Sequence, residues 1–305
     1  MQPGVVTAAS DPVFALPAQA KLNLRLWVGP RTDGALHRVL SVITELALAD
    51  ELRFLPSPAG FALTCDLPEL AGDANLIWRA VHALCGGELP PLRIDLRKHI
   101  PLQAGLGGGS ADAAAALRGL QQWPGAGRAA PADDQLRQAA GQTGSDVAAC
   151  LVPGLKVVSG NGEAVEPRPG PLPPWGIVLI KPAASMPTER AYALLDEQRA
   201  SSAPSASAER DEREFADRIV NAIHAADFAS FCALLHNDFD APVEAALPVL
   251  GSLRDRLHAC GAQATLLCGS GSCMAGFFET EADARAAHAR LQQDEGEWKA
   301  LTSLR

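Results

Sequence analysis

The segment PLQAGLGGGSADAAAA, residues 101–116, constrains the fold of this chain more than any other. It places four glycines in five positions, at 105 and at 107–109, directly before a run of good helix formers. Glycine is about 0.5–1 kcal/mol less favourable than alanine in regular structure, so such a cluster indicates that another group approaches the backbone closely. An alternating pattern predicts a strand at 92–100 before the glycines, and the sequence predicts a helix over 109–122 after them.

A glycine loop that runs into a helix N-terminus is suited to bind phosphate, because its N–H groups and the helix dipole both attract anions. The loop lacks the GKS or GKT ending of a Walker loop, and Ser110 stands where a dinucleotide fingerprint needs glycine. Ser110 is open to three roles: helix N-cap, donor to phosphate or indirect ligand of Mg2+. We expect Asp112 to point outward or to hold Mg2+ through water. A glycine turn without a ligand is the alternative.

Composition and charge exclude several classes of protein. The 305 residues suffice for two domains, and 48% hydrophobic with 20% charged residues is an ordinary globular composition. The net charge of −9 argues against a nucleic acid or an anionic membrane as partner. The seven cysteines form no CxxC pair, which favours reduced thiols, and the start of the chain has no signal-peptide pattern. These features favour a cytoplasmic protein. We expect a monomer or weak homodimer with a small-molecule substrate.

The rest of the chain predicts a mixture of strands and helices. Strand patterns lie at 20–28, 61–67, 175–182, 263–269 and 273–279, and helical patterns lie at 73–87, 215–227, 242–260 and 281–293. Asp73 and Gly86 are the expected start and stop signals of the 73–87 helix. Residues 37–55 are ambiguous between strand and helix, and residues 131–152 predict a helix, a glycine turn and a second apolar segment. We expect a turn at 29–34, an exposed mobile loop at 199–214 and a domain boundary within 168–175.

Three segments closely resemble the signature segments of the GHMP kinases: AKLNLRL at 20–26, PLQAGLGGGSADAAAAL at 101–117 and GSGSCMAGFF at 269–278. Shorter pieces fit the same family in the same order, namely TDG…H, NLIWRA, TGSDV, GNGE, PTERAY and HNDFD. The resemblance implies an α+β fold in two domains. An ATP-binding domain of the ribosomal protein S5 domain 2-like type would span 1–168, and a ferredoxin-like, substrate-side domain would span 169–305.

The resemblance also implies transfer of the γ-phosphoryl group of ATP, with Mg2+, to an alcohol. The member that this chain resembles most acts on the 2-hydroxyl of a diphosphocytidyl-linked sugar alcohol in isoprenoid precursor biosynthesis. Two alternatives stay open: another alcohol kinase of the family with a substrate that lacks cytidine, and an inactive ligand-binding member.

Lys21 and Asp146 match the catalytic pair of the family. Asp146 would accept the hydroxyl proton, and the Lys21 ammonium would orient Asp146. The plainer interpretations are a helix N-cap for Asp146 and a solvated strand lysine for Lys21. The ATP-binding residues implied are Asn75, Pro101, Gly105, Leu106, Gly107, Gly108, Gly109 and Ser110. The substrate-binding residues implied are Asn23, His37, Thr188, Tyr192, Gly269 and Ser270, and no protein ligand to a metal is implied.

The sequence departs from the family around the base-binding residues. The family places an aromatic immediately before the histidine that reads cytosine, whereas DGALH places Ala35 and Leu36 before His37. Stacking of a base on an aromatic ring contributes about 1–3 kcal/mol, so one of the two stacking faces is lost here. Tyr192, the only tyrosine, would supply the other face unless it is a core residue. Ala148, Ala149 and Asn161 are smaller departures, and a simple hairpin turn is the alternative for Gly269 and Ser270.

Overall fold

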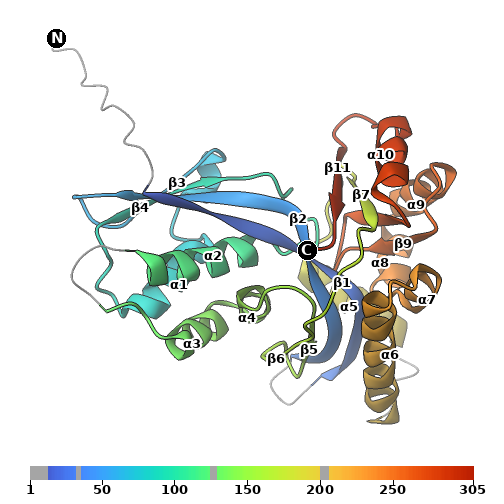
Figure 1. Cartoon of the computed structure of the whole chain (residues 1–305), viewed down its shortest axis with the longest axis horizontal. Helices are drawn as coiled ribbons and strands as arrows, with labels where there is room; N and C mark the ends of the chain where they lie inside the picture. The colour runs from blue at the N-terminus through green and yellow to red at the C-terminus, as the bar shows by residue number, and fades with distance from the viewer. Residues whose placement is uncertain (1–12, 32–35, 124–128, 200–205) are drawn as a thin grey trace.

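The chain folds around two sheets in which most strand pairs are antiparallel (Figure 1). The computed structural model describes residues 13–31, 36–123, 129–199 and 206–305. The seven-stranded sheet has the order β3-β4-β2-β1-β8, and in addition β5 pairs with β2 and β6 pairs with β5. Its strands are β1 (Phe14–Arg31), β2 (His37–Pro56), β3 (Ala62–Cys65), β4 (Leu92–Arg97), β5 (Lys156–Ser159), β6 (Ala164–Pro167) and β8 (His236–Asn237). The four-stranded sheet has the order β11-β7-β10-β9, from β7 (Gly176–Lys181), β9 (Ala264–Leu267), β10 (Met274–Phe278) and β11 (Trp298–Ser303).

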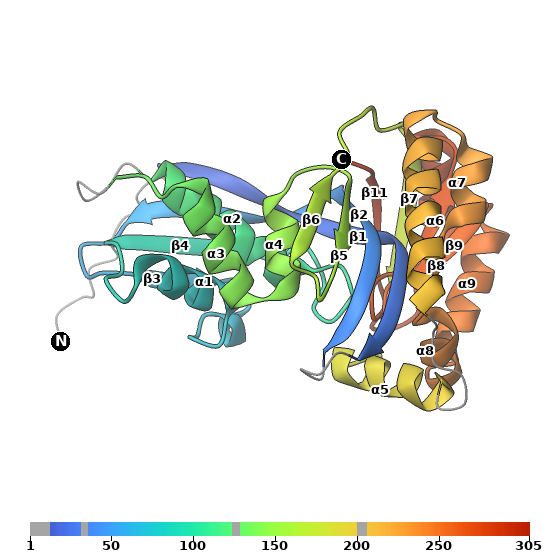
Figure 2. The same ribbon diagram turned by 90° about the horizontal axis from the view of Figure 1, so that it is seen from below.

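The two longest strands, β1 and β2, run through both halves of the molecule (Figures 1 and 2). They pair antiparallel over 18 and 20 residues, with register shifts after Gln19, Asn23 and Val28. The ambiguous segment 37–55 is therefore strand. Residues 29–31 of the expected turn belong to β1, and residues 32–35 lie outside the described residues. The alternation predicted for 92–100 is confirmed, since Leu92, Ile94 and Leu96 of β4 are buried between more exposed neighbours.

Helices α1 (Leu76–Cys85), α2 (Gly108–Gln122), α3 (Asp133–Thr143) and α4 (Ser145–Leu151) cover one face of the first sheet. The alanines at 113–116 of α2 are completely buried, so the alanine run lets this helix lie close to its neighbours. Gly119 extends the effect, because a Cβ there would lie 2.0 Å from the ring of Phe54. The predicted stop at Gly86 is confirmed, but the N-cap of α1 is Asn75 and not Asp73.

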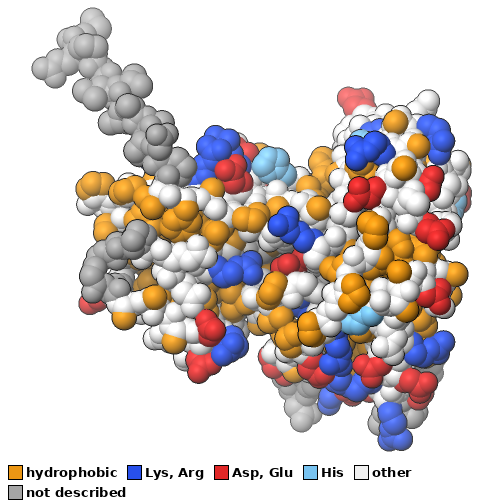
Figure 3. Space-filling view, in the orientation of Figure 1, with side chains coloured by type: hydrophobic (Ala, Val, Ile, Leu, Met, Phe, Trp, Pro, Cys, Tyr) orange, Lys and Arg blue, Asp and Glu red, His pale blue; other side chains and the backbone are white. Residues whose placement is uncertain are grey.

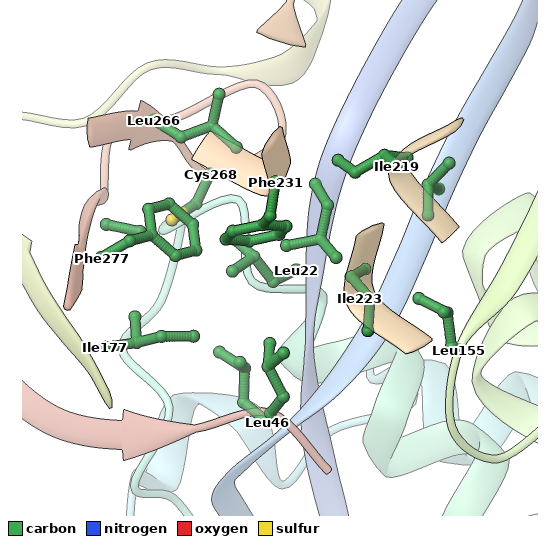
Figure 4. Packing of buried hydrophobic residues seen from close by; sticks show 14 of the residues in the cluster. Leu22, Leu46, Leu155, Ile177, Ile219, Ile223, Phe231, Leu266, Cys268 and Phe277 are labelled. Carbon is green, nitrogen blue, oxygen red and sulfur yellow. The ribbon is translucent and has the colours of Figure 1, made fainter. Parts of the chain in front are cut away.

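The second sheet is covered on both faces. Helices α8 (Asp240–Ala246), α9 (Val249–Ala259) and α10 (Glu281–Arg290) pack on one face, together with α5 (Thr188–Arg199). Helices α6 (Ala206–His224) and α7 (Phe228–Leu234) pack on the other face and also against β1 and β2. Figure 4 shows this shared core, in which Leu22, Ile223, Phe231 and Phe277 converge from both halves. A short 3-10 helix spans Pro68–Leu70.

Two sequence expectations in this half were wrong. Of the loop expected at 199–214, residues 200–205 lie outside the described residues, and the part from Ala206 onward is helical. The reason is that Glu212 pairs with Arg25 of β1 at 2.7 Å and ties α6 to the sheet. The single helix expected at 242–260 is broken at Leu247 and Pro248, since proline has no N–H to continue the ladder and instead begins the next helix. None of the helices in the described parts of the chain is long and apolar enough to cross a membrane.

Candidate active site

A cavity of about 1240 Å³ brings together the residues that the sequence singled out. The surface recedes between the two lobes of the molecule in the space-filling view (Figure 3). Of the predicted site residues, those that line the cavity are Lys21, Asn23, His37, Pro101, Gly105, Leu106, Gly107, Gly108, Gly109, Ser110, Asp146, Thr188, Tyr192, Gly269 and Ser270. Asn75 instead caps α1, accepting from the N–H of Ile77 and donating to Leu70 O, while its neighbour Leu76 lines the cavity.

The glycine loop, residues 101–109, leads directly into α2. Gly107 is the N-cap residue, with φ 67° and no side-chain cap, so the N-cap role considered for Ser110 is wrong. A Cβ on Gly107 would lie 2.6 Å from Cγ of Lys21, which explains why only glycine fits there. The first N–H groups of α2 have no partner within the helix and lie at the cavity wall, where an anion can accept from them.

The third motif packs against the glycine loop through the 268–273 turn, which connects β9 to β10. The N–H groups of Ser272 and Cys273 donate to Gln103 O and Ala104 O, each at 3.3 Å. On the other side of the loop, Lys21 N–H of β1 donates to Leu106 O at 2.9 Å. The three motifs, far apart in sequence, therefore meet in one place.

A buried ion cluster lies beside the glycine loop, where Lys98 also lines the cavity, and it corrects the expectation for Asp112. Asp112 is 2% exposed, and its Oδ2 accepts from Lys98 Nζ at 2.7 Å. Lys98 also donates to Asp50, which in turn accepts from the N–H groups of His99 and Ile100 at 2.5 and 2.8 Å. Asp112 therefore points inward because an ammonium and not solvent compensates its charge.

Burial raises the pKa of Asp112 to about 7, although the Lys98 ammonium acts in the opposite direction. Burial would lower the pKa of Lys98, but the two carboxylates outweigh it and raise that pKa. Sequence reasoning missed Lys98 and Asp50. Lys98 stands just before the glycine loop, and its Nζ would be 3.3 Å from a Cβ on Gly108, so the cluster lies against the start of α2.

The predicted catalytic pair lines the cavity. Lys21 Nζ is 3.6 Å from Asp146 Oδ2, and it also donates to Asn23 Oδ1. Asn23 Nδ2 donates to Ser41 Oγ at 2.8 Å, which fixes the amide. The Lys21 side chain is 10% exposed and that of Asp146 is 49% exposed, so the ammonium is enclosed while the carboxylate is open to the cavity. Lys21 is thus no solvated surface lysine, and the N-cap of α4 is Gly144 and not Asp146.

Aromatic rings form another part of the cavity wall. The rings of His37 and Tyr192 are stacked, with centroids 4.9 Å apart, and Phe239 meets Tyr192 edge-on at 4.8 Å. His37 Nε2 is 2.9 Å from Asp196 Oδ1. Burial raises the pKa of Tyr192 to about 12, so its hydroxyl is protonated at neutral pH. Sequence reasoning missed Asp196 and Phe239. Phe239 lies in HNDFD, a segment whose resemblance had been noted without a role.

Two further features belong to this side of the site. Thr188 Oγ1, at the start of α5, is 3.0 Å from Ser270 Oγ in the 268–273 turn, so two predicted substrate-binding hydroxyls lie side by side. Leu36, in the place of the missing aromatic, is 61% exposed and lines the cavity. Ala35 lies outside the described residues. Trp78 does not line the cavity; it packs edge-on against Phe61 at 4.6 Å, beside the core between the first sheet and helices α1–α4.

Known proteins resemble the chain over nearly its whole length. The model of the GHMP kinases N terminal domain matches residues 75–154, and that of the GHMP kinases C terminal domain matches residues 219–297. A protein from Solidesulfovibrio magneticus named 4-diphosphocytidyl-2-C-methyl-D-erythritol kinase is 37% identical over 90% of this chain and 92% of its own. A protein of the same name from Moorella thermoacetica is 37% identical over 92% and 95%.

Solved structures agree. A crystal structure of 4-(cytidine 5'-diphospho)-2C-methyl-D-erythritol kinase matches with a TM-score of 0.74 at 28% identity, over 95% of this chain and 99% of that one. A homoserine kinase from Cytophaga hutchinsonii shares the fold, with a TM-score of 0.70 at 16% identity and coverage of 99% and 98%. The expected α+β GHMP kinase fold is confirmed, and the protein is an ATP-dependent phosphotransferase with an alcohol as acceptor. The chain belongs to the GHMP kinases and, within them, to the family of the 4-diphosphocytidyl-2-C-methyl-D-erythritol kinases.

Proposed function

We propose that this protein transfers the γ-phosphoryl group of ATP to the 2-hydroxyl of 4-diphosphocytidyl-2-C-methyl-D-erythritol, in non-mevalonate isoprenoid precursor biosynthesis. One observation carries the proposal: a single cavity is lined by an anion-binding glycine loop, an enclosed lysine beside an open carboxylate, and an aromatic pair suited to a base. The names of the relatives support the same substrate.

The chemistry follows from the positions of the charged groups. The N–H groups of the glycine loop and the first turn of α2 bind the ATP phosphates, which holds the γ-phosphorus in place. Asp146 accepts the proton of the attacking hydroxyl, a contribution of about 10²–10⁴ in rate. Lys21 orients that carboxylate, and its charge offsets the negative charge that builds up during transfer.

Mg2+ is proposed to enter with ATP. The cavity offers oxygen donors of the kind that Mg2+ prefers, the Ser110 hydroxyl and the Asp146 carboxylate, while Asp112 is occupied by Lys98. These two residues would hold the ion, directly or through water, together with the phosphates. No group of three or more His, Cys, Asp or Glu side chains suited to a metal occurs among the described residues. The bound ion would neutralise phosphate charge.

Cytosine recognition is assigned to His37 and Tyr192. When His37 Nε2–H donates to Asp196, the Nδ1 atom is left as an acceptor for the cytosine amino group, which uracil lacks. Tyr192 supplies a stacking surface, and Leu36 supplies an apolar contact where the family has an aromatic. The presence of Leu36 in place of an aromatic residue is the observation that favours the second candidate, an alcohol kinase of the same family whose substrate has no cytidine.

The organisation of the molecule is part of the proposal. Residues 1–168 form the ATP-binding domain and residues 169–305 the substrate-side domain, with the two family matches on either side of that boundary. The protein acts as a monomer or weak homodimer on a small molecule, without nucleic acid. The cytoplasmic location expected from the sequence stays a prediction.

A competition among alcohols tests the function. Purified protein with ATP and Mg2+ is assayed for ADP release with 4-diphosphocytidyl-2-C-methyl-D-erythritol, its uridine analogue, mevalonate and homoserine, and the product is examined by phosphorus NMR. We expect kcat/KM for the cytidine substrate to exceed the others by about 100-fold or more, with the new phosphate on the 2-hydroxyl. Faster turnover of an alcohol without cytidine would overturn the substrate assignment in favour of the second candidate.

A further inference from the structure

We propose that Asn237 is a positioning residue for phosphoryl transfer, because its one side chain fixes both the 268–273 turn beside Lys21 and the support of Tyr192. The inference rests on the proposed function for the identity of the reaction. Asn237 is the second residue of HNDFD, and it lies in β8, which pairs with β1 at Leu26.

The Asn237 side chain is fully engaged with backbone groups. The residue is 3% exposed, and Nδ2 donates to Leu267 O at 2.8 Å and to Gly269 O at 2.7 Å. Oδ1 accepts from Phe239 N–H at 2.9 Å. Both amide protons are thus used to hold the backbone where β9 ends and the 268–273 turn begins. The carbonyl oxygen holds the backbone at a third place, Phe239.

The first of these attachments bears on the reacting centre. A Cβ built on Gly269 would lie 2.8 Å from Gly105 O and 3.2 Å from Lys21 Nζ, so this backbone lies close to both the glycine loop and the catalytic ammonium. Movement of Gly269 therefore moves the groups that locate the γ-phosphate and Asp146. Protein interiors are close-packed, and such contacts transmit displacement.

The second attachment bears on the base. Phe239 is 2% exposed and lines the cavity, and its ring supports Tyr192 edge-on at 4.8 Å. A shift of the Phe239 backbone tilts the surface on which we propose that cytosine stacks. Asn237 thus connects the place where the base is bound to the place where phosphate is transferred.

Neighbouring side chains anchor the same segment independently of Asn237. Asp238 Oδ2 accepts from Val28 N–H at 2.7 Å and pairs with Arg199 at 2.7 Å. Asp240 Oδ1 accepts from Leu267 N–H at 3.2 Å. Removal of the Asn237 amide therefore leaves β8 attached to β1, while the 268–273 turn loses its bonds from Asn237 and keeps those of Ser272 and Cys273 to the glycine loop. This separates a positioning role from a general loss of fold.

The test compares Asn237→Ala and the milder Asn237→Ser, which keeps one donor, with Asn221→Ala, an exposed control on α6. We expect kcat to fall about 10- to 100-fold in Asn237→Ala and less in Asn237→Ser, with KM for ATP changed by less than about threefold. The Kd for CDP, measured by calorimetry, rises. In Asn237→Ala, amide hydrogen exchange accelerates in residues 268–273 but stays as in the wild type in α2. The control Asn221→Ala keeps the melting temperature of the wild type.

The outcomes separate this inference from the proposed function. If the wild type does not phosphorylate the cytidine substrate, the proposed function fails, and exchange in 268–273 decides the inference alone. If the wild type is active and both Asn237 variants, folded, keep kcat within about twofold, the positioning role is overturned. Unchanged exchange in 268–273 overturns it in either case. If Asn237→Ala fails to fold, the same comparisons are made with Asn237→Ser.

Discussion

Replacing Gly105 by alanine is expected to damage the active site far more than the fold. Gly105 has φ 73°, and a Cβ there would lie 1.7 Å from Cys268 O. To restore even a 3.0 Å contact, the 268–273 turn or the glycine loop must retreat by about 1.3 Å. A misplacement of about 1 Å can slow an enzyme about 100-fold, so we expect a loss of kcat of that order.

Gly154 supplies a matched control, because it has φ 69° and no atom within 4 Å of an added Cβ. Gly154→Ala carries the left-handed strain alone, about 1–2 kcal/mol, and should keep kcat. The assay is steady-state ADP release, beside urea denaturation of both variants. The steric argument is refuted if kcat of Gly105→Ala lies within about threefold of that of Gly154→Ala.

Three further predictions concern the buried cluster, the base and acid stability. Lys98→Met leaves Asp50 and Asp112 without their cation and should lower the free energy of unfolding, measured in urea, by about 3–5 kcal/mol. Adding Asp112→Asn should restore part of that free energy. An unchanged urea midpoint in Lys98→Met would contradict the ion-cluster account. Tyr192→Ala should weaken CDP binding in calorimetry by about 1–3 kcal/mol while Tyr192→Phe does not; equal binding by both would remove the stacking role.

The acid prediction uses Asp238. Burial alone would raise the pKa of Asp238. Hydrogen bonds from His236, Val28 N–H and Arg199 outweigh burial and hold this pKa below its usual value. Its stabilising contribution is therefore complete above the unfolded pKa near 4 and is lost as the pH falls through the lower folded pKa. Urea denaturation between pH 6 and pH 3 should show a smaller loss of stability in Asp238→Asn than in the wild type; parallel losses would contradict the assignment.

Features set by local chemistry were predictable from the sequence. Gly86 ends α1 where predicted, because the left-handed conformation there favours glycine. The glycine loop and the start of α2 follow from the same preference. Lys21 and Asp146 could be named only through the resemblance, since neither residue alone differs from an ordinary strand lysine or a residue in the first turn of a helix.

Features set by distant partners were not predictable. The inward orientation of Asp112 depends on Lys98, 14 positions away, and on the further contact of Lys98 with Asp50, 48 positions away. The helix that replaces the loop expected at 199–214 depends on Arg25 of β1, which holds Glu212 from 187 positions away. A serine- and charge-rich composition gives no sign of such a contact.

The central claim is that Asp146 accepts the proton of a cytidine-linked alcohol. The most direct test measures transfer from ATP to 4-diphosphocytidyl-2-C-methyl-D-erythritol by wild type and by Asp146→Asn, with binding of ATP and CDP measured on the same samples. The account predicts that kcat falls by about 10²–10⁴ while both affinities stay within a few-fold. Transfer by Asp146→Asn within about tenfold of the wild type would contradict the proposed base, and a folded, ATP-binding wild type without transfer would contradict the substrate.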